Sequence, residues 1–453
     1  MLREQAVGEC REPLAAGIWR VDRTAENENR GKPAMRREHE TETDTLPLWR
    51  NHDYLLLQGG QIVSYVGNQQ QFIALPLLVL ALTGSVVKAG LAVSLQTIAV
   101  LVVSPLAGAL ADRWNRKRTM LLCDAGRALV ILSIPLAYWL GHLTMPQLYL
   151  AVTLAGVLGT IFSVANAAAL PNVVPPQQLP EALAQSQAAY SGVRTLGALL
   201  GGTLFGIGAV LPFLVNAISF GASVGSLGLI RRDLQSHEKH AGLPLTRAIA
   251  EGFAWLWREP LLRFLTLING GDSLRYGAGY LVIIVLAGEL GASPRGIGAI
   301  FTGAAIGALL GNLASGRVRG RVRFGTLAIS MLWLEALMFP LYAVAPGVFF
   351  MGLIAAAEEF VGPMYNVSFS SYRLMATPDA MRGRTSSTVQ MVTQGAQSLG
   401  AILGGVLIQA AGAHWSALLL GGWLMLLALA TTLNRRVRAA SLEVPQATGT
   451  LVP

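Results

Sequence analysis

Four side chains with acid–base or aromatic chemistry follow one another along a helical stripe inside a long apolar stretch of this sequence. Asp272 and Arg275 are three residues apart, and Tyr276 and Tyr280 lie four and eight residues beyond Asp272. Residues three or four apart share a helix face, so the acid and the base can neutralise each other. The tyrosines on the same stripe favour a second interpretation, in which these side chains line an aqueous cavity between membrane helices.

Three glutamates lie near the middle of two further apolar stretches, Glu335 in one and the adjacent Glu358 and Glu359 in the other. Neighbouring residues on a helix point about 100° apart, so at least one of the adjacent pair must face a cavity or a packed interface. A carboxyl removed from water favours its neutral form, which holds a proton. We therefore expect proton coupling by one of four carboxyls; the alternative is that Arg275 or another buried arginine neutralises them. The four candidates are Asp272, Glu335, Glu358 and Glu359.

Charged and amide side chains also interrupt the apolar stretches of the first half. Asp124 and Arg127 are again three residues apart, and we expect them to form a structural ion pair. Arg194 either meets an acidic partner or extends along its helix to the aqueous boundary. A run of four amides offers hydrogen-bonding groups to a substrate path: Asn68, Gln69, Gln70 and Gln71.

Other kinds of chemistry lack the residues that they need. The sequence contains two cysteines, Cys10 and Cys123, and no Cys-x-x-Cys or His-Glu-x-x-His motif, so neither a metal site nor a disulfide framework is predicted. The six histidines fall outside the apolar stretches, and none of the four lysines lies in the Gly-Lys-Ser/Thr context of a phosphate-binding loop. We therefore expect no cofactor, no ATP site and no enzymatic activity.

The elements that must position these residues are membrane-spanning helices. Of the 453 residues, 53% are hydrophobic and 13% charged, against about 25% charged in a soluble domain. The apolar stretches do not alternate as β-barrel strands do, and each is long enough to cross ~30 Å of hydrocarbon. An all-α protein of the lipid bilayer with twelve spans is therefore predicted. The spans are 54–81, 89–110, 118–140, 146–169, 187–208, 210–230, 263–287, 296–316, 324–344, 347–371, 387–411 and 415–434.

Basic residues mark one side of the membrane. The net charge is +9, and the basic residues cluster in the gaps after the second, sixth, eighth and tenth spans and after the last one, which is a topology pattern rather than a nucleic-acid patch. The gaps on the opposite side contain only two basic residues, Lys88 and Arg295. One gap departs from the pattern: the gap after the fourth span is expected on the basic side but has no basic residue. We expect both termini to be cytoplasmic and the protein to lie in the plasma or inner membrane of a prokaryote.

The two halves of the chain repeat each other at a separation of 203 positions. Three matches share this one offset, which predicts a duplicated six-helix unit in which both halves have the same orientation. The pairs are Gly108-Ala-Leu-Ala with Gly311-Asn-Leu-Ala, Leu196-Gly-Ala-Leu-Leu-Gly-Gly with Leu399-Gly-Ala-Ile-Leu-Gly-Gly, and Pro175 with Pro378.

This repeat and the gaps between the spans predict five regions. A disordered cytoplasmic tail is expected at 1–48, six-helix bundles at 49–230 and 263–434, and a cytoplasmic tail at 435–453. The linker at 231–262 contains an apolar helical stripe and is expected to form an interfacial amphipathic helix.

The gap after the second span, at residues 108–118, reads GALADRWNRKR. It resembles the signature loop of the major facilitator superfamily, G-x-L-[AS]-D-R-x-x-R-[KR]-x, at every constrained position. The resemblance implies the major facilitator fold, with twelve transmembrane helices in two six-helix bundles, and secondary transport by alternating access. It also implies a conformational latch between the halves, whereas retention of basic residues at the cytoplasmic face would explain the arginines but not the acid. The latch residues are Gly108, Asp112, Arg113 and Arg116.

Further stretches, among them NAISF at 216–220 and TPDAMRGRTSS at 377–387, resemble the branch of exporters for drugs, macrolides and siderophores. This resemblance implies a proton-coupled exporter of a bulky amphipathic molecule, and we expect a monomer. Ala198 stands where antiporters of the superfamily have a proline, and the first span lacks the acid that several drug exporters have there. Import of a sugar or another metabolite, or a sensor or scramblase that does not transport, therefore remains an alternative.

Overall fold

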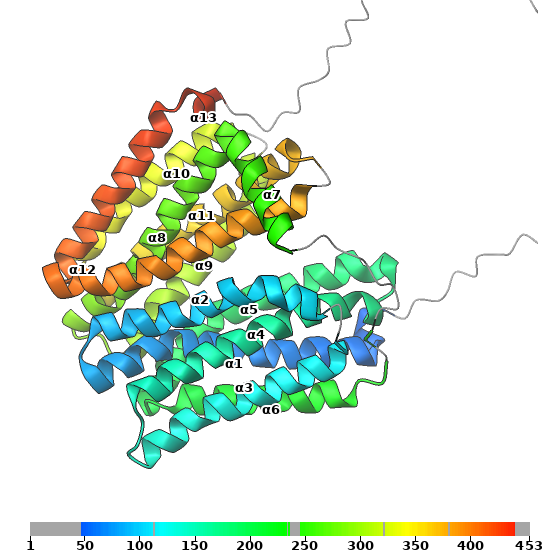
Figure 1. Ribbon diagram of the computed structural model, residues 1–453. Coiled ribbons are helices and arrows are strands. Elements are labelled where there is room, and N and C mark those ends of the chain that lie inside the picture. Colours follow the sequence, from blue (N-terminus) through cyan, green and yellow to red (C-terminus); the bar gives the residue numbers. More distant parts are fainter. Residues whose placement is uncertain are drawn as a thin grey trace, which may run out of the picture. The chain divides into compact units, whose positions relative to one another are not determined.

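The computed structural model describes residues 47–111, 114–232, 234–235, 245–319, 322–378 and 381–439. Within these ranges every regular element is a helix. Figure 1 shows the first six long helices on one side and those from α7 onward on the other. The all-α class predicted from the sequence is confirmed. The predicted tails fall largely outside the described residues.

The N-terminal bundle contains six long helices, of which the first packs against the fifth and the sixth. The second packs on the fourth, and the third lies against the fourth and the sixth. Short 3-10 turns, η1 (Leu48–Arg50) and η2 (Pro176–Gln178), precede the first and the fifth helix. The six are α1 (His52–Thr83), α2 (Val86–Ala111), α3 (Arg116–Trp139), α4 (Met145–Val173), α5 (Leu179–Ile207) and α6 (Leu211–Leu229).

The C-terminal bundle is built around the contacts of α8 with α12 and of α9 with α11. In α12 the backbone is non-helical at Gly412, where φ is 80°, a value that glycine adopts without the steric penalty of a side chain. The last two predicted spans therefore form one element with a sharp bend. The elements are α8 (Pro260–Glu289), α9 (Pro294–Arg319), α10 (Phe324–Met338) with its 3-10 extension η3 (Phe339–Val344), α11 (Val348–Ala376), α12 (Arg382–Leu433) and α13 (Arg435–Ala439).

A helix also lies in the predicted linker, where α7 (Leu245–Arg258) packs on α12. Gly252 faces the backbone carbonyl of Arg384, and the Arg384 guanidinium pairs with the carboxylate of Glu251. These contacts fix α7 to the first turns of α12.

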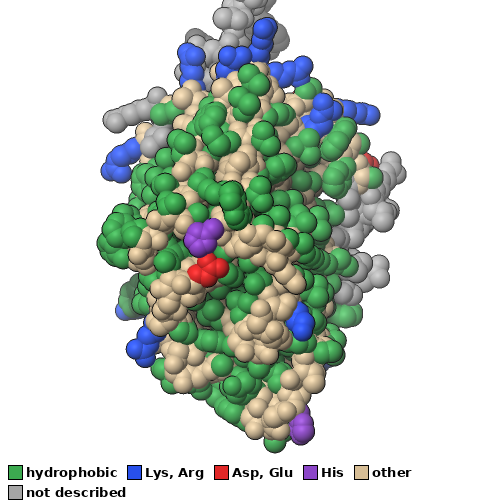
Figure 2. Space-filling view, turned by 90° about the vertical axis from the view of Figure 1, so that its left-hand side faces the viewer, with side chains coloured by type: hydrophobic (Ala, Val, Ile, Leu, Met, Phe, Trp, Pro, Cys, Tyr) green, Lys and Arg blue, Asp and Glu red, His purple; other side chains and the backbone are tan. Residues whose placement is uncertain are grey.

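Among the described residues, nine helices are long and apolar enough to cross a membrane, and α12 counts once although it covers two predicted spans. The helices α5 and α8 coincide with predicted spans but fall outside this set of nine, and α8 contains the pair Asp272 and Arg275. The count of twelve spans thus stays a prediction. Large side chains such as Leu122, Leu129 and Phe349 are exposed, and in Figure 2 hydrophobic side chains dominate the visible face. Such a surface suits lipid rather than water.

Contacts between small residues of α2 and α12 and of α5 and α9 bring the two bundles together. A Cβ on Gly90 of α2 would lie 2.3 Å from the carbonyl oxygen of Ala401 on α12, and one on Gly298 of α9 would lie 2.7 Å from that of Ala198 on α5. Ala198 and Ala401 are separated by the 203 positions of the sequence repeat. The alanine in each contact therefore occupies the same position of the repeat, whereas Gly90 and Gly298 are 208 positions apart.

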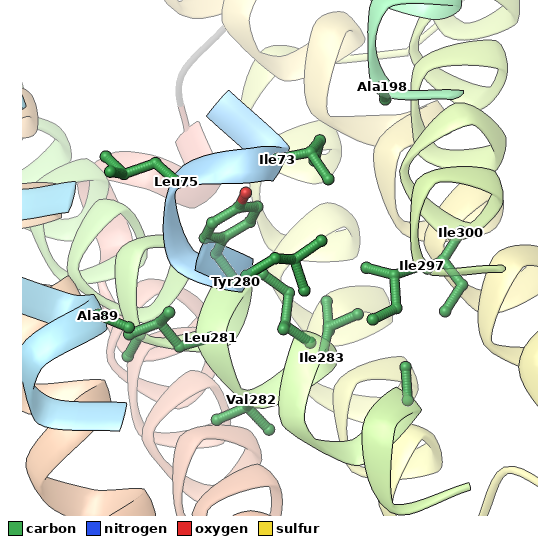
Figure 3. Packing of buried hydrophobic residues seen from close by; sticks show 14 of the residues in the cluster. Ile73, Leu75, Ala89, Ala198, Tyr280, Leu281, Val282, Ile283, Ile297 and Ile300 are labelled. Carbon is green, nitrogen blue, oxygen red and sulfur yellow. The ribbon is translucent and has the colours of Figure 1, made fainter. Parts of the chain in front are cut away.

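Apolar side chains of both bundles form one buried core beside these contacts. It includes Ile73 and Leu75 of α1, Ile283 of α8 and Ile297 of α9. In Figure 3 the hydroxyl of Tyr280 points toward the helix that carries Ile73. This hydroxyl donates a hydrogen bond of 2.8 Å to the backbone carbonyl of Phe72 and so ties α8 to α1.

Candidate functional site

One arginine gathers three carboxylates from three helices. The guanidinium of Arg275 lies 2.8 Å from Oδ1 of Asp272 on the preceding turn of α8 and 3.3 Å from Oε2 of Glu335 on α10. It also pairs with Oε1 of Glu358 on α11. We call these four residues the Arg275 cluster. Three of the four carboxyls predicted from the sequence thus meet at one point.

Aromatic side chains close the Arg275 cluster on the side of η3. The guanidinium carbon of Arg275 is 5.3 Å from the ring centre of Phe339, and the hydroxyl of Tyr342 donates a hydrogen bond of 3.1 Å to Oε2 of Glu358. Only 4% of the Arg275 side chain is exposed. Sequence reasoning missed Phe339 and Tyr342; a tyrosine hydroxyl inside an apolar stretch was the available signal, since a buried hydroxyl needs a partner.

The charges of the Arg275 cluster do not balance when every carboxyl is ionised. One guanidinium then faces three carboxylates, and the site carries two excess negative charges, with Glu335 and Glu358 buried and Asp272 facing the larger cavity. Burying unpaired charge costs several kcal/mol even after relaxation. Protonation of one carboxyl would remove part of this excess charge without any movement of a helix.

The fourth predicted carboxyl lies beside the cluster and faces the other bundle. Oε2 of Glu359 is 4.0 Å from Nη2 of Arg194 on α5. The side chain of Tyr276 on α8 interacts with both of them. Arg194 is half-exposed, unlike Arg275. Of the two interpretations that the sequence left open for Arg194, the structure places it near an acidic partner.

Two cavities adjoin these groups. The larger, of about 470 Å³, is lined by α8, α11 and α12 and receives Asp272 and Tyr276 together with amides such as Gln394. The smaller, of about 40 Å³, is lined by Tyr276 and Tyr280 as well as Glu358 and Glu359. Tyr276 lines both cavities and so lies between the larger one and the two glutamates.

The charged pair of the first half has a simpler surrounding. Nη1 of Arg127 is 3.1 Å from Oδ1 of Asp124, and Nη2 donates a hydrogen bond of 2.9 Å to Oδ1 of Asn68 on α1. The guanidinium lies 3.9 Å from the ring centre of Phe220 on α6, and Asp124 is fully buried. We call these four residues the Arg127 cluster. It holds one acid and one base in the interior of the N-terminal bundle.

The remaining amides of the predicted substrate path take part in helix packing. Oε1 of Gln71 accepts a hydrogen bond of 2.6 Å from Asn216 on α6. Gln69 and Gln70 lie against Gly197 and Gly201 of α5, where a Cβ would approach within 2.4 Å and 2.7 Å. Gln70 and Gln71 are both buried. In this conformation the three glutamines hold α1 against its neighbours.

The signature loop is described only in part. Asp112 and Arg113 lie outside the described residues, and Gly108 belongs to the last turn of α2. The guanidinium of Arg116 donates hydrogen bonds to the carbonyl oxygens of Ala168, at 2.9 Å, and Leu234, at 3.3 Å. Arg116 therefore joins the start of α3 to α4 and to the segment after α6.

Long apolar helices with exposed leucines around a charged and partly hollow interior define a multi-pass membrane transport protein. The chain belongs to the Major Facilitator Superfamily, whose family model matches residues 59–273 and 273–451. The resemblance found in the signature loop is thereby confirmed, and the function is transport rather than catalysis.

Relatives within the superfamily include efflux proteins. The chain is 26% identical over 410 residues to the multidrug efflux pump Tap of Mycolicibacterium fortuitum, covering 86% of this chain and 97% of that protein. It is 27% identical over 368 residues to the enterobactin exporter EntS of Escherichia coli, covering 79% of this chain and 87% of that protein. Among solved structures, the nucleoside transporter NupG superimposes with a TM-score of 0.70 at 14% identity, over 84% of this chain and 99% of that one, and is similar in fold.

Proposed function

We propose that this protein is a proton-coupled exporter of a bulky amphipathic small molecule, a drug, macrolide or siderophore, in the cell membrane of a prokaryote. The observation that carries the proposal is the Arg275 cluster, in which three carboxylates share one buried guanidinium beside a cavity of about 470 Å³. Because two carboxylates lack a compensating charge, protons are the natural counter-ions of this site.

The direction of transport rests on the relatives and on the lining of the cavities. Two relatives are a multidrug efflux pump and an enterobactin exporter. Amide, hydroxyl and aromatic side chains make up most of the linings around the few charges, which suits a large and weakly charged ligand. Alternating access then moves the ligand outward while protons move inward through Asp272, Glu335, Glu358 or Glu359.

Purified protein in proteoliposomes tests the coupling. An imposed proton gradient should drive transport of a fluorescent hydrophobic dye, and a protonophore should abolish it. Asp272→Asn, Glu335→Gln, Glu358→Gln and Glu359→Gln are compared one at a time, with Glu289→Gln as the control because Glu289 is exposed and pairs with His414 at 3.2 Å, away from the cluster. At least one of the four should lose gradient-driven transport while Glu289→Gln retains it.

Two results would contradict this function. If all four variants transport with the pH dependence of the unmodified protein, proton coupling by these carboxyls is wrong. If expression leaves dye retention in cells unchanged but permits growth on a new sugar or metabolite, import replaces export.

The orientation in the membrane is part of the proposal, with both termini in the cytoplasm and a monomer as the transporting unit. Reporter fusions after residues 115, 240, 320 and 440 should report the cytoplasm, and fusions after 143 and 413 the opposite side. A fusion at 440 that reports the external side contradicts the twelve-span arrangement.

A further inference from the structure

Three residues join the two bundles at the point where the small-residue contacts end. Arg194 belongs to α5 of the N-terminal bundle, whereas Tyr276 and Glu359 belong to α8 and α11 of the C-terminal bundle. Gly202, whose Cβ would lie 2.3 Å from the carbonyl oxygen of Pro294 in the other bundle, follows Arg194 by eight residues. Eight residues of helix rise about 12 Å. Ala198, whose carbonyl oxygen would lie 2.7 Å from a Cβ on Gly298, follows Arg194 by only four residues. The Arg194–Tyr276–Glu359 group, which we call the bridge, therefore lies about one turn from the nearest packed contact.

The bridge is also continuous with the Arg275 cluster. Glu359 directly follows Glu358, and both line the cavity of about 40 Å³, which has room for a few water molecules. The charged and titratable groups that face Glu359 come from four elements of the C-terminal bundle and from α5. They are Arg194 of α5, Asp272, Arg275 and Tyr276 of α8, Glu335 of α10, Tyr342 of η3 and Glu358 of α11.

Arg194 differs from Arg275 in what it can tolerate. The Arg275 side chain is 4% exposed, so removal of its acidic partners would leave a guanidinium buried without compensation. The Arg194 side chain is 51% exposed, so the protein encloses its guanidinium much less than it encloses that of Arg275. Of the two arginines, Arg194 is the one that can lose and regain a carboxylate partner during a transport cycle at small cost.

We propose that the bridge couples protonation to movement of the bundles, with Arg194 and Tyr276 as positioning residues for Glu359. The proposal rests on the proton-coupled function above. A proton from water in the cavity binds a carboxylate oxygen of Glu359, the attraction for Arg194 of the other bundle is lost, and the bundles separate at this level. Release of the proton restores the ion pair and draws α5 toward α11.

The test measures distance instead of transport. In a background with Cys10→Ser and Cys123→Ser, spin labels are attached at Leu183→Cys and Ser387→Cys, which are exposed positions near the first turns of α5 and α12. Double electron–electron resonance in liposomes is recorded between pH 5 and pH 9. We expect two distance populations whose ratio changes with pH, by about fivefold if the bridge has the strength of a partly exposed ion pair.

The variants separate the bridge from general structure. In Glu359→Gln and in Arg194→Gln, the ratio of the two distance populations should be the same at every pH. Arg194→Lys keeps the positive charge, so its ratio should still change with pH. Tyr276→Phe retains the ring and should reduce the response without abolishing it. Glu289→Gln is the matched control and should behave as the unmodified protein.

The proposal is overturned if the ratio of distance populations in Glu359→Gln changes with pH as it does in the unmodified protein. It is also overturned if the ratio in the unmodified protein does not depend on pH. Because the labels report distance without substrate or gradient, a protein that fails to export dye but shows the expected ratios would contradict the proposed function and leave the bridge standing. A protein that exports dye by proton coupling, but whose pH-dependent ratio of distance populations is unchanged by Glu359→Gln, would support the proposed function and contradict the bridge.

Discussion

Arg127 and Arg275, the two arginines buried among the residues that the structure describes, begin from the same local motif and end in different surroundings. Arg127 and Arg275 each follow an aspartate by three residues, pair with it on one helix face and lie near a phenylalanine ring. A neighbouring helix then brings the amide of Asn68 to Arg127, whereas two neighbouring helices bring Glu335 and Glu358 to Arg275. The comparison teaches that an Asp-x-x-Arg pair does not by itself fix the charge balance of its surroundings; the acids contributed by other helices do, and the proposed proton-binding role depends on them.

The largest expected effect is at Arg275. Its replacement by glutamine leaves three carboxyls without a cation, so we expect loss of gradient-driven transport and a decrease in the free energy of unfolding of about 3–5 kcal/mol. Proteoliposome flux and thermal unfolding in detergent measure the two effects. Arg295→Gln is the control, because Arg295 is exposed and lies in the first turn of α9. Transport by Arg275→Gln at the normal rate would remove the Arg275 cluster from the mechanism.

A double substitution separates the balanced cluster from the unbalanced one. Arg127→Gln alone should also destabilise the protein, because Asp124 is fully buried and loses its ion pair. Adding Asp124→Asn should restore the free energy of unfolding to within about 1 kcal/mol and leave transport active, since no excess charge remains.

The same approach should fail in the C-terminal bundle. Arg275→Gln combined with any one of Asp272→Asn, Glu335→Gln or Glu358→Gln still leaves two carboxyls, so stability and transport should stay low. Full recovery by one of these pairs would show that a single acid balances Arg275, and the two clusters would then be equivalent.

The smallest expected effects come from one hydrogen bond in each cluster. Tyr342→Phe removes the donor to Glu358 and Asn68→Ala removes the acceptor for Arg127, each at a cost of about 1.5–3 kcal/mol in unfolding free energy because one partner of each bond is charged. The ionised form of Glu358 loses a donor, so the pH profile of transport by Tyr342→Phe should move to higher pH. The profile of Asn68→Ala should keep its midpoint; a shift there would give the Arg127 cluster a part in coupling.

Much of the fold was accessible from the sequence because each span satisfies its own backbone within one helix. The predicted limits of the first span, 54–81, lie within two residues of α1 at His52–Thr83. The bend at Gly412 and the 3-10 geometry after Met338 depend on local backbone angles that hydrophobicity does not encode. The helices were therefore predictable, and their irregularities were not.

The candidate site was predictable only within a helix. Spacing identified the pairs Asp124 with Arg127 and Asp272 with Arg275, since both partners lie on one turn. Nothing in the spacing brings Glu335 of α10 to Arg275, because that contact depends on how the bundle closes. The spacing also could not show that Gly197 and Gly201 of α5 pack against the amides Gln69 and Gln70, and the role of these amides in a substrate path stays a prediction.

The contacts of Gly90 with Ala401 and of Gly298 with Ala198 resemble an isologous interface, because the two alanines occupy the same position in each half. The chain is in this respect a homodimer fused into one polypeptide. A true homodimer would have to carry any proton-binding site twice, once in each subunit. Fusion removes that constraint, and one half can hold three carboxylates around Arg275 while the other keeps a single neutral pair.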